Sequence, residues 1–187
     1  LVMATQNPLD QEGTYPLPEA QMDRFMMKVI VSYPQRDEER EVLRRMSSTM
    51  AAPTASVVTN LDSITSARQL INEIHVDPKI EDYILDIVLA TRAEGRLQLS
   101  ERQADLNLSS FDPLITAGAS PRATIQLVRG ARCLAFLEGR AHVLPEDVKS
   151  ITADILRHRI IPSYEAQAED MGADTIINQL LDILRTP

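Results

Sequence analysis

The sequence contains no tryptophan, a single cysteine and few aromatic side chains. Aromatic residues make up 4% of the 187 residues, so aliphatic side chains and seven methionines must fill the core, a composition that favours helices. The lone Cys133 cannot form an intramolecular disulfide, which predicts a reducing compartment and hence a cytoplasmic location. No apolar run approaches the ~20 residues that a membrane-spanning helix requires, so we expect no membrane insertion.

Positive charge is also scarce. There are 19 Lys and Arg residues against 27 Asp and Glu residues, which gives a net charge of −8. Broad nucleic-acid binding relies on a cationic surface that displaces counterions, so this balance argues against it. The three histidines are scattered, and neither they nor Cys133 have the spacing of metal ligands. We therefore expect no metal site built from these residues.

Residues 1–35 follow a different pattern from the rest of the chain. Val2 to Ala4 resembles the end of a buried strand, and Phe25 to Val31 is an apolar run typical of a strand covered on both faces. Between them lie a loop rich in Pro and Gly, Asn7 to Pro18, and a short helix candidate, Glu19 to Arg24. This pattern predicts a strand–loop–helix–strand piece of an α/β sheet.

From Asp37 onward the apolar residues recur with helical spacing. The caps and stripes predict helices near residues 37–46, 64–74, 78–95, 121–138, 145–156 and 174–184. The stretch Leu97 to Gly118 has no clean period, which indicates a long loop or a short hairpin. We therefore predict a mainly α protein with a domain boundary between residues 35 and 36.

Two polar residues of the first segment are candidates for a site. Asn7 follows a predicted buried strand, where open α/β sheets bind ligands, although Asn7-Pro8 is also a common start of a turn. Arg24 lies between a short helix and a strand, where a fixed cation can neutralise charge during phosphoryl transfer. The alternative for Arg24 is a salt bridge to Asp23 or Glu19.

Arg122 is the third candidate. Ser120-Pro121 is a helix-start signal, and it places Arg122 in a first turn, where free backbone N–H groups and the helix dipole favour an anion. An arginine there strengthens a phosphate site. The alternative is a solvated arginine that shares a charged face with Arg129 and Arg132.

Four stretches together resemble one family. They are ATQNP, EGTYPLPEAQMDRF, GASPRATIQL and RAHVLPEDVKSITADILRHRI, and in wording and order they resemble the second half of a MoxR-type AAA+ ATPase. The resemblance implies that residues 1–35 are the end of the α/β ATPase core and that residues 36–187 are the helical lid. It also implies that the chain is a C-terminal part of such an ATPase.

The resemblance implies a role for each candidate. Asn7 matches sensor 1, which positions the lytic water, Arg24 matches the arginine finger that serves the neighbouring subunit, and Arg122 matches sensor 2. The parent protein would be a cytoplasmic hexamer that uses ATP and Mg²⁺ for chaperone-like remodelling or maturation of partners, often proteins with a von Willebrand factor A domain.

The sequence also departs from the family pattern. No G-x-x-x-x-G-K-[ST] stretch is present, and no acidic pair closes an apolar strand to hold Mg²⁺. We therefore expect this chain to be inactive alone and to bind no nucleotide. Leu144 replaces the usual hydroxyl residue before the Pro-Glu-Asp helix, a change worth about 1 kcal/mol locally.

Without the rest of the sheet, residues 1–35 have no native strand neighbours. We expect them to be disordered, to fold onto the helical part or to pair with another chain. The alternative to the ATPase is a non-enzymatic helical interaction module. Its face of Arg122, Arg129 and Arg132 would bind an acidic partner or nucleic acid.

Overall fold

The computed structural model describes residues 2–6, 17–47 and 54–187 and is mainly helical, as predicted. Its helices are α1 (Glu19–Met22), α2 (Arg36–Met46), α3 (Leu61–Glu73), α4 (Pro78–Ala90), α5 (Pro121–Leu137), α6 (Pro145–Leu156), α7 (Tyr164–Ala168) and α8 (Ala173–Ile183). Two short 3-10 helices, η1 (Glu94–Gln98) and η2 (Ser109–Phe111), and two short strands, β1 (Ile115–Ala117) and β2 (Ile161–Pro162), complete it.

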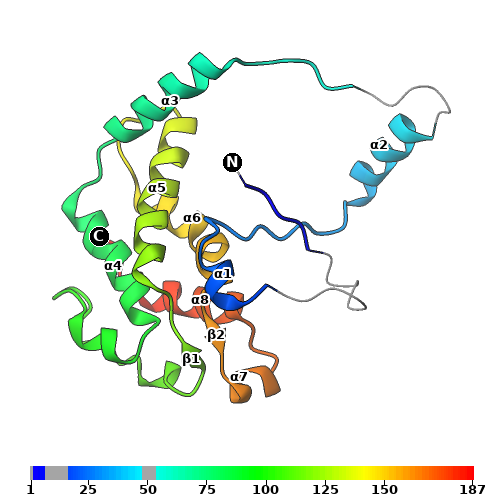
Figure 1. The fold of residues 1–187 in the computed structure, drawn as a ribbon. Helices are drawn as coiled ribbons and strands as arrows, with labels where there is room; N and C mark the ends of the chain where they lie inside the picture. Colours follow the sequence, from blue (N-terminus) through cyan, green and yellow to red (C-terminus); the bar gives the residue numbers. More distant parts are fainter. Residues whose placement is uncertain (1, 7–16, 48–53) are drawn as a thin grey trace.

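Helices α4, α5, α6 and α8 form the core of the molecule (Figure 1). Each contributes fully buried aliphatic side chains, among them Ile84, Leu127, Ile155 and Ile176. On α5 the apolar residue Ile125 faces away from this core and is 52% exposed. Buried positions on α5 recur every four residues along 123, 127, 131 and 135, and a residue two positions from one of them lies on the opposite side of a helix.

Local signals set most helix ends. The Asp77 side chain accepts a hydrogen bond from the backbone N–H of Lys79 (2.9 Å) at the start of α4, as the cap pattern predicts. Gly139 follows α5 with a φ of +69°, a left-handed conformation that glycine adopts without strain. Helix α4 ends at Ala90, before the predicted end near residue 95.

The region predicted as a loop or hairpin, residues 97–118, is irregular apart from η1, η2 and β1. Strand β1 pairs antiparallel with β2, which follows α6, rather than with a second strand of the same region. The pairing therefore joins the loop before α5 to the chain after α6.

Neither strand predicted in residues 1–35 is present in the described part of the chain. Residues 2–6 and 25–31 have no strand geometry, and Val2 and Val31 are 79% and 91% exposed. A strand requires a neighbouring strand for its backbone hydrogen bonds, and among the described residues no strand pairs with either run. Of the predicted strand–loop–helix–strand piece, only the helix is observed, as α1.

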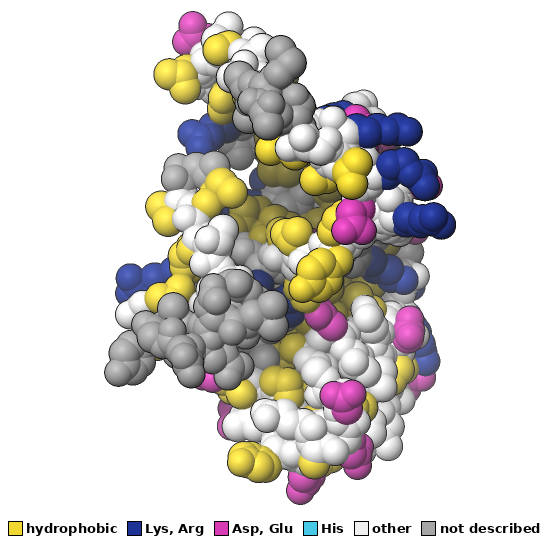
Figure 2. Space-filling view, turned by 90° about the vertical axis from the view of Figure 1, so that its right-hand side faces the viewer, with side chains coloured by type: hydrophobic (Ala, Val, Ile, Leu, Met, Phe, Trp, Pro, Cys, Tyr) yellow, Lys and Arg dark blue, Asp and Glu magenta, His cyan; other side chains and the backbone are white. Residues whose placement is uncertain are grey.

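Helix α2 is formed as predicted but stands apart from the core (Figure 1). The Gln35 backbone N–H donates to Glu38 at its first turn (2.8 Å). None of its residues is buried, and Val42, Leu43 and Met46 expose their side chains. In the view of Figure 2, apolar side chains gather over the upper half of the visible face of the molecule.

No helix in the described ranges is long and apolar enough to cross a membrane.

Candidate functional site

The loop before α5 presents Arg122 in the first turn of that helix. Ser120 is the N-cap, its side-chain oxygen accepts from the backbone N–H of Arg122 (3.3 Å), and Pro121 is the first helical residue. The predicted helix start is therefore confirmed. Backbone N–H groups at such a start lack helical partners and favour an anion.

The end of α4 holds this loop in place. The Ala119 N–H donates to Thr91 Oγ1 (3.0 Å), and the Ala119 carbonyl accepts from Arg92 Nε (2.6 Å). A Cβ on Gly118 would lie 2.3 Å from the Thr91 carbonyl oxygen, so only glycine fits there without movement. Arg122 consequently projects from a rigid support.

The Arg122 side chain forms an ion pair with Asp23. Its Nη1 lies 2.5 Å from Asp23 Oδ2, and the Arg122 side chain remains 47% exposed. The partner is 99 residues away in the chain, so Arg122 is not merely a solvated arginine on a charged face.

Asp23 neutralises a second arginine as well. Its Oδ1 accepts from Arg159 Nε (3.0 Å), and the Ser120 hydroxyl donates to both carboxylate oxygens (3.0 and 3.2 Å). Burial alone would raise the pKa of Asp23, but the hydrogen bonds from Ser120, Arg159 and Arg122 and the charge of Arg159 outweigh it. The pKa is therefore lowered and the carboxylate is charged at neutral pH.

Arg159 is the buried centre of the cluster, with a side chain that is 0% exposed. Besides Asp23 Oδ1, it donates to the carbonyl oxygens of Asp23 (2.9 Å), Phe25 (2.5 Å), Met26 (3.2 Å) and Ile155. Buried charge is tolerated where it is paired and its donors are satisfied, as here. Arg159 therefore fixes residues 22–28, which we call the Arg24 segment, onto the end of α6.

The two residues before Arg159 add to this attachment. Arg157 Nη1 donates to the Lys28 carbonyl (2.5 Å), and the Lys28 N–H donates to the Asp154 carbonyl (2.8 Å). His158 Nε2 lies 3.3 Å from the Phe25 carbonyl. Burial, with the charge of Arg159, lowers the pKa of His158 to about 4, so the ring is neutral at pH 7 and its Nε2–H can donate.

Arg24 is exposed beside this cluster. Within the part of the chain that the structure describes, it forms no ion pair with Asp23 or Glu19, the alternative that the sequence left open. Asp23 instead turns toward α5 and α6. Arg24 thus directly follows in the chain the residue that pairs with Arg122, whereas Asn7 lies outside the described residues.

Sequence reasoning missed Asp23 and Arg159 as members of the site. Three consecutive basic residues at 157–159 near the end of a helix are expected from the helix dipole alone, so they carried no further signal. Their partners in the Arg24 segment lie 129 to 136 residues earlier in the chain.

The three arginines proposed as one basic face occupy different environments. Arg122 is paired with Asp23, and Arg129 is exposed. Arg132 is half-buried, and its Nε has no hydrogen-bond partner among the described residues. They do not present three equivalent free cations.

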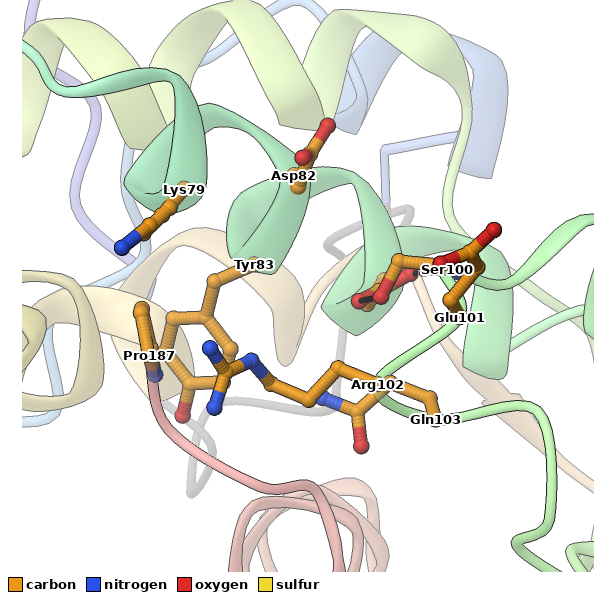
Figure 3. Close-up of a pocket in the computed structure, with 9 residues that line it drawn as sticks. Lys79, Asp82, Tyr83, Ser100, Glu101, Arg102, Gln103 and Pro187 are labelled. Atoms are coloured by element: carbon orange, nitrogen blue, oxygen red, sulfur yellow. Dashed lines mark hydrogen bonds between the residues drawn. The ribbon is translucent and has the colours of Figure 1, made fainter.

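A cavity of about 280 Å³ lies elsewhere, along the first half of α4 (Figure 3). Figure 3 shows Tyr83 reaching from α4 toward the loop that carries Arg102. Burial, with a contribution from Glu146, raises the pKa of Tyr83 to about 12. Asp86 in the same wall accepts from the Ser100 N–H (2.8 Å) and hydroxyl (2.6 Å). This cavity is separate from the Arg122 loop, which the other end of α4 holds.

No metal site is apparent in residues 2–6, 17–47 and 54–187, where no three His, Cys, Asp or Glu side chains form a group able to hold an ion. The described residues offer cations for a phosphate, and they offer no carboxylate cluster for Mg²⁺.

Two family models match the chain. Residues 107–180 match the AAA lid domain, and residues 1–27 match the ATPase family associated with various cellular activities. Together with the relatives below, these matches decide the family. The chain belongs to the MoxR-type AAA+ ATPases. Its helical part is the AAA lid, and a short piece of the AAA module precedes it.

Relatives and a solved structure agree with this assignment. Chaperone MoxR1 of Mycobacterium tuberculosis is 37% identical over 187 residues, which are 100% of this chain and 47% of the relative. Protein MoxR of Paracoccus denitrificans is 34% identical over 178 residues, 90% of this chain and 50% of the relative. A crystal structure from Cytophaga hutchinsonii, provisionally described as an ATPase, superimposes with a TM-score of 0.85 at 40% identity, covering 97% of this chain and 52% of that one. The chain thus spans about half the length of its MoxR-type relatives.

Proposed function

We propose that this chain supplies the nucleotide-sensing and lid portion of an ATPase that couples ATP binding and hydrolysis to chaperone-like remodelling of partner proteins. The observation that carries the proposal is the position of Arg122. It lies in the first turn of α5, half-exposed, with a single carboxylate as its ion-pair partner among the described residues. A phosphate oxygen can replace that carboxylate, because both anions accept charge-assisted hydrogen bonds from a guanidinium.

The residues present fit the phosphate end of ATP. Arg122 and the first-turn N–H groups of α5 favour a terminal phosphate as sensor 2, and the exposed Arg24 is free to reach a nucleotide on a neighbouring subunit as the finger. When bound, Mg-ATP supplies the phosphoryl group and the metal charge that holds it. The described residues bind and orient that group, and they do not hold the metal.

The remaining roles follow from family membership and are part of the same proposal. Asn7 would position the lytic water as sensor 1. The whole protein would form a hexameric ring in the cytoplasm, and its partners would include proteins with a von Willebrand factor A domain. The name of the Mycobacterium tuberculosis relative, Chaperone MoxR1, supports the remodelling role.

The decisive experiment concerns Arg24 in the full-length protein. We expect Arg24→Ala to lower the ATP turnover number by roughly 10³-fold or more, as loss of a trans-acting finger does, while nucleotide affinity is largely kept. Steady-state ATPase assays and nucleotide titration measure the two quantities. Arg129→Ala, an exposed arginine on α5, is the matched control and should leave turnover near wild type.

Mixed rings test whether Arg24 acts on a neighbour. Subunits with Arg24→Ala are combined with subunits that lack the P-loop lysine, so that an intact finger can face an intact nucleotide site. Partial recovery of turnover supports the proposal. If no mixing ratio restores activity, Arg24 does not serve a neighbouring site.

A further inference from the structure

The two arginines that share Asp23 are held very differently. Arg159 is 0% exposed and also donates to four backbone carbonyls, so it cannot leave without unpairing buried donors. Arg122 is 47% exposed, and in the described residues its guanidinium has Asp23 as its ion-pair partner. Arg122 is therefore the exchangeable partner of Asp23, and Arg159 is the permanent one.

This difference has a consequence for a phosphate at Arg122. Arg122 Nη1 donates to Asp23 Oδ2 at 2.5 Å, and this bond turns the guanidinium toward the carboxylate. The Arg122 guanidinium has other N–H donors, but its contact with Asp23 fixes where it lies, so a phosphate that draws Arg122 away from this position must break the contact. The carboxylate stays in place meanwhile, because Arg159 and the Ser120 hydroxyl continue to hold it.

Asp23 also directly precedes Arg24 in the chain. Its carboxylate and its carbonyl oxygen are both anchored by Arg159, so the backbone that presents Arg24 is attached to the lid at this point. The ion pair between Arg122 and Asp23 therefore involves the residue directly before the candidate finger.

We propose that Asp23 is a positioning residue that holds Arg122 away from the nucleotide until a terminal phosphate replaces Asp23 as the partner of Arg122. This exchange links phosphate sensing at Arg122 to the segment that presents Arg24. The inference rests on the proposed function and adds to it a residue that sets the preference for ATP over ADP. Only a nucleotide with a terminal phosphate at Arg122 must break the Asp23 contact, so the competition weakens ATP binding and leaves ADP binding unaffected.

The test compares ATPγS and ADP affinities of the full-length protein by titration. We expect Asp23→Asn to tighten ATPγS binding by about two- to fivefold, the range that a half-exposed ion pair represents, with the ADP affinity unchanged. Asp174→Asn is the matched control. It removes the same charge from an ion pair with Arg157, another arginine that holds the Arg24 segment, and Asp174 does not contact Arg122. It should change neither affinity.

The Arg122→Ala background separates exchange from general electrostatics. There, Asp23→Asn should no longer alter the ratio of ATPγS to ADP affinity. An equal gain for both nucleotides, no gain, or a gain that persists without Arg122 would each overturn the proposal. If the wild-type protein binds neither nucleotide, the proposed function itself is at fault.

A wild-type measurement covers the case in which Asp23→Asn does not fold. In structures of the full-length protein, the Arg122 guanidinium should contact Asp23 with ADP bound and the terminal phosphate with ATPγS bound. An Arg122–Asp23 ion pair that persists with ATPγS would contradict the exchange.

Discussion

Asp23 balances the charge of two arginines that reach it from α5 and from the end of α6. One of them, Arg159, is fully buried, and a buried cation that loses its anion retains the full cost of desolvation. The carboxylate is therefore a structural requirement of the Arg24 segment as well as a partner of Arg122. Its removal and its protonation should have related effects.

We predict that Asp23→Ala lowers the free energy of unfolding of the 187-residue chain by about 2–3 kcal/mol at pH 7, because charged hydrogen bonds to a buried guanidinium are lost. Urea denaturation followed by circular dichroism measures the change. Asp105→Ala, which removes an exposed ion pair with Arg185, is the control and should change the free energy of unfolding far less.

The difference in the free energy of unfolding between wild type and Asp23→Ala should depend on pH in a defined direction. The pKa of Asp23 is lowered by folding, so its contribution is present above the ordinary carboxyl value of 3.8 and is lost as pH falls through the folded-state pKa. The gap between wild type and Asp23→Ala should be constant above about pH 5 and should shrink in more acidic solution. A gap that widens in acid would show that the charge of Asp23 does not stabilise the fold.

The start of α6 compensates for a missing cap. Leu144 has no side-chain acceptor for the first helical N–H groups, yet the Asp147 carboxylate accepts from the Leu144 N–H (2.8 Å). The Asp147 carboxylate also accepts hydrogen bonds from both terminal nitrogens of Arg140 (2.8 and 2.5 Å). Burial alone would raise the pKa of Asp147, but Arg140 and the Leu144 N–H lower it overall. The acidic residue in the first turn thus performs the half of the capping box that the sequence retains.

We therefore predict that Asp147→Ala lowers the free energy of unfolding by about 2 kcal/mol, because it removes a helix cap and a largely buried ion pair together. Thermal or urea unfolding of the 187-residue chain checks the value. Glu146→Ala changes an exposed acid in the same turn and should stay within about 0.5 kcal/mol. Equal losses of unfolding free energy in the two variants would mean that these acidic residues stabilise α6 only through the helix dipole.

At the level of the whole chain, the predicted boundary at residue 35 divides segments that are in contact. Residues 22–28 are attached to α5 and α6 by Arg157, Arg159 and Asp23, whereas α2 beyond the boundary stands apart from the core (Figure 1). Residues 22–28 fold onto the helical part, one of the outcomes expected for residues 1–35. In stability terms, the Arg24 segment belongs with the lid.

A pair of truncations tests this attachment. Deleting residues 1–28 removes the partners of Arg159, and we expect the melting temperature of the remaining helices to fall by roughly 5–10 °C. Deleting residues 1–16 keeps the Arg24 segment and removes residues 2–6, which are exposed, so the melting temperature should stay near that of the full chain. Equal melting temperatures for the two truncations would contradict this attachment and support the predicted boundary between residues 35 and 36.

The sequence signals that predicted the fold correctly depend on interactions between residues a few positions apart. Asp77-Pro78 and Ser120-Pro121 marked the starts of α4 and α5, because an N-cap binds N–H groups two or three residues away. The same local rule placed Arg122 in a first turn. The motifs shared with the family and the helical spacing of the aliphatic residues predicted the helical lid. Helical spacing is also a local signal, because neighbours on one face of a helix are three and four positions apart.

Contacts between distant segments were beyond the sequence. The apolar run Phe25 to Val31 predicts a strand only if a neighbouring strand is present, and in the described chain none pairs with it. The sharing of Asp23 between Arg122 and Arg159 joins residues 99 and 136 positions apart. No periodicity or cap encodes such a pairing, because it arises only when packing of α5 on α6 brings their ends to the same place.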